Sequence, residues 1–439
     1  MAAVRFARRF VGWLTRNVAP GLAVFFVLLT IVAITAELYL RLTKPFIKTQ
    51  WISRFDPELG FTFEPGALIR HTNYIDFWSE QRANSWGFLD DEPPPPARKS
   101  GTCRIAFVGD SFVEAAQVSI EQKFHRLLEQ SWNSKESIIQ VETFALGYSG
   151  TGQANQLPWA GLIASRAPDL VVLVFVSNDF ANNNVWIEAV RNGWHPNHPP
   201  RPFIRDGRIF GPNPDWRQYV LPGQTGSAQA AWSVSSGGIS GWLHRKLYQK
   251  SYLYSALNRM WVHYYYGAPA YYANVPGALA ELRKLPGGEA AFGDFNPPAD
   301  LTLDQMFEAN RLPAAFTAAL ADTREAVRIW KKRAEAMGAK LAILATHTLK
   351  APGLPMAPQA AQARQATSGL LFSRLRQITE DEQILLIDQA EFIRRSGGDF
   401  KRASFPFDGH WSEYGHRMAA GTLAEALRAY PELCRRAAP

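Results

Sequence analysis

The 439-residue sequence contains only two cysteines, Cys103 and Cys434. It has no Cys-x-x-C motif and no cysteine and histidine cluster at the spacing of zinc ligands, so it indicates no zinc site. It also has no internal repeat and no glycine-rich loop of the kind that holds phosphate groups. We therefore expect no cofactor, and any chemistry would come from the chain's own side chains.

Charged and hydrophobic residues are present in ordinary proportions, 20% and 47%. This composition excludes a largely disordered chain and a membrane protein with many spans. The length exceeds that of a usual single domain, so we expect one enlarged domain or a core with a large insertion. The net charge of +8 would suit nucleic acid, but part of it has a topological explanation at the N-terminus, and we expect no nucleic-acid partner. The N-terminal arginines are Arg5, Arg8, Arg9 and Arg16.

One long hydrophobic run is present, an uncharged stretch of 19 residues from Val18 to Ala36. At about 1.5 Å per residue, a helix of this length covers the roughly 30 Å of a bilayer core. We expect a transmembrane helix over residues 18–42, with the arginine-rich residues 1–17 in the cytoplasm and the rest of the chain outside it. A cleaved signal peptide is the main alternative, but Ile34-Thr35-Ala36 is a poor cleavage site. A buried helix of a soluble protein fits the upstream arginines less well.

In this topology the two cysteines lie outside the cytoplasm, where disulfides persist. A bond between them would join the start of the first core strand to the C-terminal tail. The sequence alone leaves open whether Cys103 and Cys434 pair or are two separate buried thiols.

Beyond residue 100, short apolar runs alternate with helical patterns. Uninterrupted apolar strands are typical of a parallel sheet that is covered on both faces. The predicted strands are 105–108, 138–146, 169–178, 340–347 and 384–388, and the predicted helices are 112–130, 314–337 and 412–430. We expect a three-layer α/β/α sandwich of flavodoxin-like type with about five parallel strands.

The alternation also suggests how the chain is divided after the membrane helix. Residues 43–100 form a turn-rich lead-in that ends in a stiff linker, Glu92-Pro-Pro-Pro-Pro96. The sandwich is expected to come from residues 101–182 and 313–433. Residues 183–312 fit the alternation poorly and are expected to form an insertion or a second lobe.

Within the insertion, residues 201–210 predict a β-hairpin around Asp206-Gly207. Exposed aromatic rings could stack on sugar faces, which would suit a carbohydrate ligand. Packing within the insertion, or against a membrane surface, explains the same residues more simply. The aromatic residues are Trp232, Trp242, Tyr248, Tyr252, Tyr254, Trp261 and Tyr264 to Tyr266.

A serine stands at the end of the first predicted strand, in Gly109-Asp110-Ser111. In open α/β sheets, the carboxyl ends of the strands form the binding crevice, and the N-terminus of the following helix points to the same place. Ser111 is therefore a candidate nucleophile. Serine is also a favoured N-cap, so taken alone Ser111 could simply cap the helix.

Polar segments follow three other predicted strands. Acyl transfer by a serine needs a base, an acid that orients the base, and donors for the developing oxyanion. Asp408-Gly-His410, between the last strand and the last helix, supplies an acid and a base. Gly147-Tyr-Ser-Gly150 follows the second strand and offers a backbone N–H, and Asn178 ends the third and offers an amide.

This order of serine, glycine, asparagine and Asp-His resembles the SGNH/GDSL hydrolase superfamily over residues 100–180 and 310–430. The resemblance implies an ester-cleaving enzyme with a Ser-His-Asp triad. It prefers Gly150 over Gly147 as the oxyanion glycine, because Ser149-Gly-Thr-Gly aligns best with the family's block. The residues it assigns are the triad Ser111, His410 and Asp408 and the oxyanion donors Ser111 N–H, Gly150 N–H and Asn178 side chain.

The Asp408-x-His410 spacing is shorter than the Asp-x-x-His of many members and resembles the Asp-x-His-Trp segment of proteins that acetylate alginate and related polysaccharides. Asp56-PELGF61 and Asn84-SWGF88 resemble the lead-in of membrane-anchored members associated with bacterial surface polysaccharides. The resemblance therefore implies a single-pass protein of the bacterial inner membrane, with its catalytic domain periplasmic or extracellular.

Four other ionisable residues lie near the expected site. His416 is a rival base, one or two helical turns beyond His410. His347, at the end of the fourth strand, lines the cleft or belongs to the core. Asp110 is expected to anchor the nucleophile loop, and Asp388 to be structural.

We expect an esterase acting on acyl esters, in particular acetyl esters of carbohydrate. A polysaccharide O-acyltransferase would use the same triad, because the first half-reaction is shared. A non-catalytic glycan-binding or assembly protein on the same scaffold is the third hypothesis.

Overall fold

The structure is a computed structural model. It describes residues 18–46, 49–134, 139–191, 201–205, 208–211, 250–258, 288–293, 311–346, 372–406 and 408–434, with a few further positions between 243 and 307. The chain forms two compact units: unit 1 comprises Met1–Lys48 and Ser236–Met260, and unit 2 comprises Thr49–Ser235 and Trp261–Pro439.

Unit 1 contains the apolar helix α2 (Ala19–Thr43). Pro20 lies in its first turn, where a missing N–H costs nothing. Its stretch Pro20–Thr43, of 24 residues, is the single helix in the described part of the chain that is long and apolar enough to cross a membrane. The helix predicted over residues 18–42 is confirmed.

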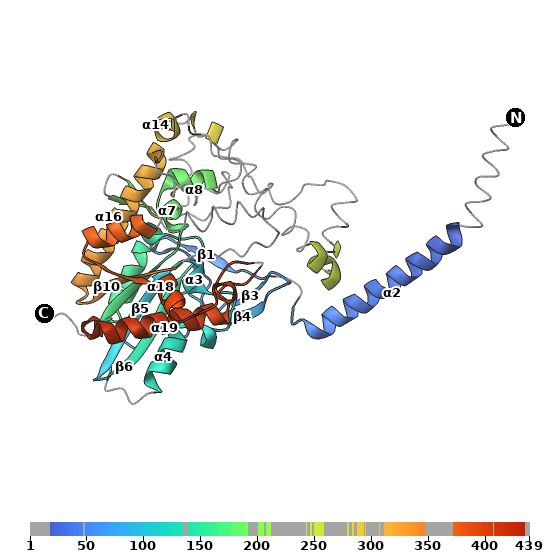
Figure 1. Cartoon of the computed structure of the whole chain (residues 1–439), viewed down its shortest axis with the longest axis horizontal. Helices are drawn as coiled ribbons and strands as arrows, with labels where there is room; N and C mark the ends of the chain where they lie inside the picture. Colours follow the sequence, from blue (N-terminus) through green and yellow to red (C-terminus); the bar gives the residue numbers. More distant parts are fainter. Residues whose placement is uncertain are drawn as a thin grey trace. The chain divides into compact units, whose positions relative to one another are not determined.

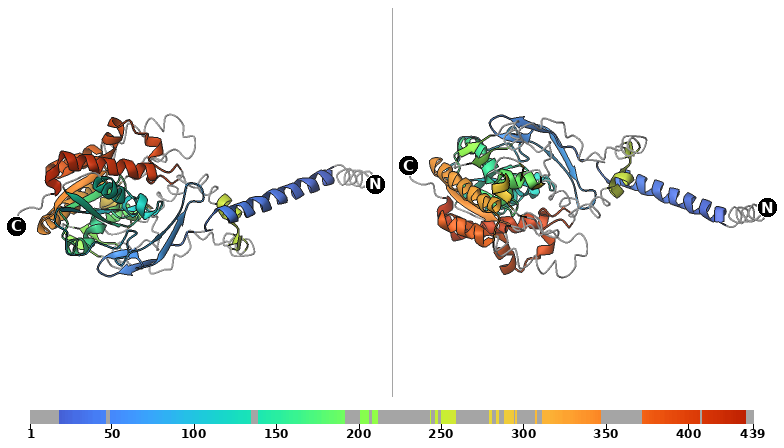
Figure 2. Two further views of the ribbon diagram at one scale, coloured as in Figure 1. Left: turned by 90° about the horizontal axis from the view of Figure 1, so that it is seen from below. Right: turned by 90° about the horizontal axis from the view of Figure 1, so that it is seen from above.

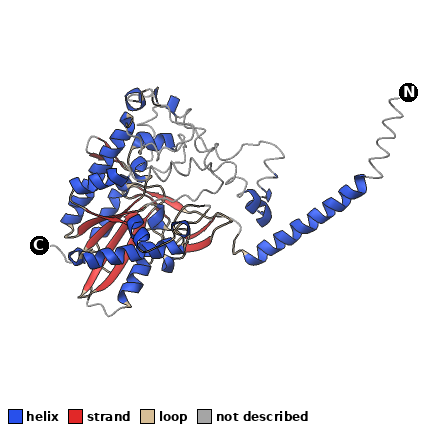
Figure 3. Ribbon diagram, viewed as in Figure 1, coloured by secondary structure: helices blue, strands red, loops and turns tan. Residues whose placement is uncertain are grey.

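Unit 2 is built on a five-stranded sheet with the order β11-β10-β7-β5-β6 (Figures 1 and 3). All neighbouring strands are parallel. The chain order reverses between β5 and β7, which is the flavodoxin-like arrangement, and ligands of such sheets bind at the carboxyl ends of the strands beside this point. The strands are β5 (Thr102–Gly109), β6 (Gln140–Gly147), β7 (Leu170–Phe175), β10 (Lys340–Ala345) and β11 (Leu385–Asp388).

Two helical layers cover the sheet, because successive strand residues point to opposite faces. Ala106 and Val108 of β5 pack in the cluster that contains α16 (Ala314–Ala336). Ile105 and Phe107 pack in the cluster that contains α4 (Phe124–Asn133) and α19 (Glu413–Ala429). Figure 2 shows these layers, with α16 in orange and α19 in red. The predicted three-layer sandwich is confirmed.

The shorter helices lie at the ends of the strands and between the layers. They are α3 (Ser111–Glu114), α5 (Gln153–Gln156), α6 (Ala160–Ala164), α7 (Asp179–Asn182), α8 (Val185–Arg191), α14 (Gly288–Phe292) and α18 (Gln389–Arg395), with 3-10 turns at Ile120–Gln122, Leu157–Trp159, Phe400–Arg402 and Pro431–Cys434.

The helix expected over residues 112–130 is broken, and this prediction was wrong. α3 ends at Ala115, which has a left-handed φ of 45°, and α4 starts only at Phe124. The Gln81 side-chain amide donates to the carbonyls of Ala115, at 2.9 Å, and Val118, at 2.5 Å. These carbonyls have side-chain partners from a remote segment, so the backbone does not need to continue the helix.

The lead-in is more regular than the sequence suggested. It contains the antiparallel pairs β1 (Ser53–Asp56) with β2 (Gly60–Phe63) and β3 (Leu68–Thr72) with β4 (Trp78–Arg82). Phe63 is fully buried in the same cluster as the sheet. The lead-in is therefore part of the core of unit 2.

The insertion contributes to both units. The predicted hairpin is present as β8 (Phe203–Arg205) and β9 (Arg208–Phe210), and Phe203 is buried in the α16 cluster. Tyr252 and Tyr254 belong to unit 1 and are half-buried. The other aromatic residues of the sugar-stacking hypothesis lie outside the described residues.

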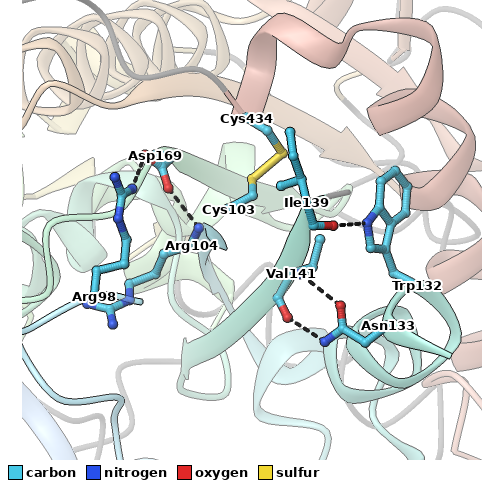
Figure 4. The surroundings of a disulfide bond; sticks show 9 residues. All are labelled: Arg98, Cys103, Arg104, Trp132, Asn133, Ile139, Val141, Asp169 and Cys434. Atoms are coloured by element: carbon cyan, nitrogen blue, oxygen red, sulfur yellow. Dashed lines mark hydrogen bonds and ion pairs between the residues drawn. A yellow bond between two sulfur atoms is a disulfide. The ribbon is translucent and has the colours of Figure 1, made fainter. Parts of the chain in front are cut away.

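A disulfide joins Cys103, at the start of β5, to Cys434 in the last 3-10 turn (Figure 4). Their Cα atoms are 5.2 Å apart across a sequence separation of 331 residues. Beside Cys103, the Arg104 N–H donates to Asp169 Oδ2 at 2.8 Å. The disulfide therefore ties the C-terminal tail to the start of β5, an inner strand of the sheet.

Candidate active site

Ser111 and His410 meet at the carboxyl end of the sheet. The Ser111 Oγ lies 2.7 Å from His410 Nε2, and His410 Nδ1 lies 2.5 Å from Asp408 Oδ1. Ser111 follows β5 directly and opens α3. The structure thus brings together the three residues that the sequence proposed as a triad.

Ser111 is not the cap of α3. Asp110 holds the N-cap position, and its Oδ1 accepts from the Phe112 N–H at 3.0 Å. The capping interpretation of Ser111 was therefore wrong, because the preceding residue takes that role. Its hydroxyl is left to face His410, and Asp110 anchors the loop as expected.

The short Asp-x-His spacing works because of Gly409. This residue has a φ of 90°, a conformation that glycine adopts without strain. The turn is closed by bonds from Gly409 N–H to the Phe405 carbonyl, at 2.9 Å, and from Phe405 N–H to the His410 carbonyl, at 2.8 Å. It turns Asp408 back onto the imidazole two residues later.

Charges around the imidazole set its protonation. Burial disfavours the charged ring, but the Asp408 carboxylate, with Asp110 and Glu114 farther away, raises the pKa of His410 above its usual 6.5. Burial also opposes ionisation of Asp408, yet His410 holds the pKa of that carboxyl below its usual 3.8. Each partner thus favours the charged form of the other.

Asn178 points its amide into the same region from the end of β7. Its Nδ2 donates to Asn182 Oδ1 at 2.8 Å and to Asp110 Oδ2 at 3.1 Å. The bond to Asn182 is the shorter one and fixes the orientation of the amide. The longer bond is the one to Asp110, the residue immediately before Ser111.

The two candidate glycines have different environments. A Cβ on Gly147 would lie 2.2 Å from the backbone nitrogen of Glu114, so Gly147 is needed for the close packing of β6 against α3. Gly150 lies in the next loop with a φ of 69°. Within the described part of the chain, neither the Gly150 N–H nor the Ser111 N–H has a hydrogen-bond acceptor. This arrangement favours Gly150 as an oxyanion donor.

Glu114 binds the loop that carries Gly150, and the sequence did not point to this residue. Its carboxyl group accepts from the Ser149 N–H at 2.6 Å and from the Ser149 hydroxyl at 2.7 Å. Burial raises the pKa of Glu114 to about 7 despite these two bonds. The one feature of the sequence that could have indicated this role is the position of Glu114 about one helical turn after Ser111.

A buried lysine supports the same helix. Lys123 Nζ donates to the Glu114 carbonyl at 2.6 Å and also to the Leu89 carbonyl. Burial lowers the pKa of Lys123 to about 8. Lys123 thus links the end of α3 to the lead-in.

The remaining ionisable residues considered from the sequence do not contact Ser111 in the described structure. His416 is buried, its Nδ1 accepts from the Phe124 N–H at 3.2 Å, and burial holds its pKa well below 6.5, so it is not a base for Ser111. Asp388 caps α18 through bonds from Ala390 and Glu391. His347 lies outside the described residues.

Among the residues that the structure describes, no group of three or more histidine, cysteine, aspartate or glutamate side chains is placed to hold a metal ion. At Ser111 the structure places a serine hydroxyl, an imidazole and a carboxylate in line, with the Asn178 amide in the same region.

Several solved structures are similar to this chain in fold. They include the acetyl xylan esterase AlAXEase (11% identity, 74% of this chain and 99% of that chain, TM-score 0.33). They also include Axe2, an acetylxylan esterase from Geobacillus stearothermophilus (12% identity, 74% of this chain and 92% of that chain, TM-score 0.33). A third is a member of the lipolytic protein G-D-S-L family from Veillonella parvula (10% identity, 74% of this chain and 98% of that chain, TM-score 0.32).

No family model and no curated protein sequence matches this chain. At such identities and TM-scores the similarity concerns the fold alone, and the activity has to be argued from the site.

Proposed function

We propose that this chain is a membrane-anchored serine esterase of SGNH/GDSL type. The observation that supports this most directly is the continuous contact from Ser111 Oγ through the His410 ring to Asp408, at 2.7 and 2.5 Å. Such a chain is what a serine needs for activation, because its hydroxyl is a weak nucleophile at its own pKa.

In the proposed mechanism, Ser111 Oγ attacks the ester carbonyl carbon and its proton passes to His410 Nε2. Asp408 stabilises the imidazolium that forms. The oxyanion accepts bonds from Ser111 N–H, Gly150 N–H and the Asn178 amide. Collapse of the intermediate breaks the ester C–O bond, and His410 protonates the departing alcohol. His410 then deprotonates a water, which attacks the acyl-enzyme and releases the acid.

We propose acyl esters of carbohydrate, in particular acetyl esters, as substrates. This rests on the Asp408-x-His410-Trp411 segment, which resembles that of polysaccharide acetylating proteins. An O-acyltransferase would differ only in the second step, where a sugar hydroxyl replaces water.

The membrane anchor is proposed from α2 and its surroundings in unit 1. Glu37, near the outer end of the helix, accepts from the Ser251 hydroxyl and the Leu253 N–H, both at 2.8 Å. The Arg41 guanidinium lies over the Tyr252 ring at 5.3 Å. The helix end thus packs on a distant segment of its own chain, which favours a retained anchor over a cleaved signal peptide. We propose an inner-membrane location with the catalytic unit outside the cytoplasm.

The test uses the full-length protein in detergent with p-nitrophenyl acetate and with an acetylated xylo-oligosaccharide. We expect turnover of both and its loss in Ser111→Ala. Acetyl transfer to an added unacetylated oligosaccharide would favour the acyltransferase, and release of acetate alone would favour the esterase. Glycan binding without Ser111-dependent turnover would instead support the non-catalytic hypothesis.

A further inference from the structure

A buried ion pair lies behind the loop that carries Gly150. Arg201, just before β8, donates from Nη1 to the Gly150 carbonyl and contacts Glu188 Oε1 at 3.1 Å. The side chains of Arg201 and Glu188 are only 7% and 2% exposed. Both residues belong to the insertion, whose role the sequence left open.

The same pair reaches the second oxyanion donor. Glu188 Oε2 accepts from Asn182 Nδ2 at 2.8 Å, and Asn182 Oδ1 accepts from Asn178 Nδ2 at 2.8 Å. One connected set of bonds therefore runs from the Gly150 carbonyl through Arg201, Glu188 and Asn182 to the Asn178 amide. These residues come from different loops and helices, and the ion pair joins them.

The bonds fix the direction of the Gly150 N–H. The peptide before Ser149 is held by Glu114 through the Ser149 N–H, and the peptide after Gly150 is held by Arg201 through the Gly150 carbonyl, so the Gly150 N–H lies between two anchored peptides. The residue has a left-handed φ, and a Cβ would come within 3.3 Å of the Arg201 guanidinium. An oxyanion hole depends on donors that are held in place before charge develops, so anchoring on both sides has a catalytic use.

We propose that Arg201 and Glu188 are positioning residues that hold the two oxyanion donors, the Gly150 N–H and the Asn178 amide, in register with each other. This inference rests on the proposed esterase function. A charged pair is suited to the task because each partner, once buried, needs the other, so neither can swing away without leaving an unpaired charge. The insertion would then be part of the support of the catalytic site.

The test compares full-length wild type, Arg201→Ala, Arg201→Lys and Glu188→Gln with p-nitrophenyl acetate. We expect kcat to fall about 10- to 100-fold in Arg201→Ala and Glu188→Gln with KM changed less than about threefold, because the donors act mainly on the transition state. Arg201→Lys should recover part of kcat, because an ammonium keeps the charge opposite Glu188 and can donate to the Gly150 carbonyl, but it lacks the planar geometry of the guanidinium.

A second readout is inactivation by a fluorophosphonate, which builds negative charge on the phosphoryl oxygen. The maximal inactivation rate should fall in the same order as kcat. The matched control is Arg104→Ala, which removes another buried arginine, paired with Glu142 at 2.7 Å near the opposite end of β5. It should lower thermal stability and leave kcat unchanged.

The positioning role would be overturned if Glu188→Gln and Arg201→Lys kept the wild-type kcat and inactivation rate. It would also be overturned if the variants of the pair lost no more kcat than Arg104→Ala does at the same loss of stability. These two conservative variants also answer the question if Arg201→Ala does not fold. Absence of Ser111-dependent turnover in the wild type would overturn the proposed function, and the positioning role with it.

Discussion

His410 Nε2 lies 2.7 Å from Ser111 Oγ, although 299 positions separate the two residues. The sheet explains how they meet. Ser111 follows a strand beside the point where the strand order reverses, and His410 lies in the turn before α19, whose apolar face packs on the same sheet. Trp411 secures the turn, with its ring centroid 5.1 Å from that of Phe112.

The raised pKa of His410 predicts the pH dependence of activity. The base must be neutral, so kcat/KM should fall as the pH drops through a pKa above 6.5. In Asp408→Asn the acid limb should move to lower pH, because the charge that raises the pKa is gone, and kcat should fall about 10²- to 10⁴-fold. The measurement is a pH–rate profile from pH 5 to 9. An acid limb that does not move in Asp408→Asn would contradict the assigned role of Asp408.

The two glycines should respond differently to alanine. Gly147→Ala places a Cβ against the Glu114 backbone, so we expect a loss of about 1–3 kcal/mol in the free energy of unfolding. In Gly150→Ala the new Cβ contacts only the Arg201 side chain, although alanine is strained at this positive φ. This variant should lower kcat more than stability. Urea unfolding and p-nitrophenyl acetate kinetics on both variants separate these effects. Equal effects of the two variants on kcat would argue against Gly150 as the donor.

Glu114 should make stability depend on pH. Burial raises its folded-state pKa from 4.5 to about 7, so the folded state holds a proton that the unfolded state releases. Stability is then lost as the pH rises from about 4.5 to about 7, by up to about 3 kcal/mol. Urea unfolding at pH 5 and pH 7 should show this loss in the wild type, and a smaller one in Glu114→Gln. The same pH slope in both proteins would show that Glu114 is ionised in both states.

The disulfide should stabilise unit 2, because it closes a very long loop in the unfolded chain. Cys103→Ser and Cys434→Ser should each lower the free energy of unfolding by about 2–5 kcal/mol, and the double variant by no more than the larger single loss. A reducing agent should destabilise the wild type and leave the variants unchanged. Additive losses, or a wild type insensitive to reductant, would mean that the cysteines do not pair.

Much of the sheet was predictable because its signal is local. Each strand is an apolar run, and the polar residues at its carboxyl end stand next to it in the sequence, so Ser111 and Asn178 could be placed at one edge. His410 lies farther from its strand, beyond α18, and the family resemblance was needed to assign it to the same site. The break after α3 was not predictable, because it depends on Gln81 from the lead-in. Helical periodicity over residues 112–130 carries no trace of that contact.

The support of the site was also hidden in the sequence. The Arg201–Glu188 pair and the Glu114–Ser149 contact join residues from different segments, and their charges look like ordinary surface residues until the fold buries them. Pairing of Cys103 with Cys434 depended likewise on where the tail returns to the sheet. Local pattern gives the reacting groups, and tertiary packing gives what holds them.

The most direct test of the central claim is labelling of the full-length protein with a fluorophosphonate, followed by mass spectrometry of its peptides. The proposed function predicts a single phosphonylated residue, Ser111, with labelling lost in Ser111→Ala and strongly slowed in His410→Ala. Persistent labelling at another serine in Ser111→Ala, or no labelling of the folded wild type, would contradict it.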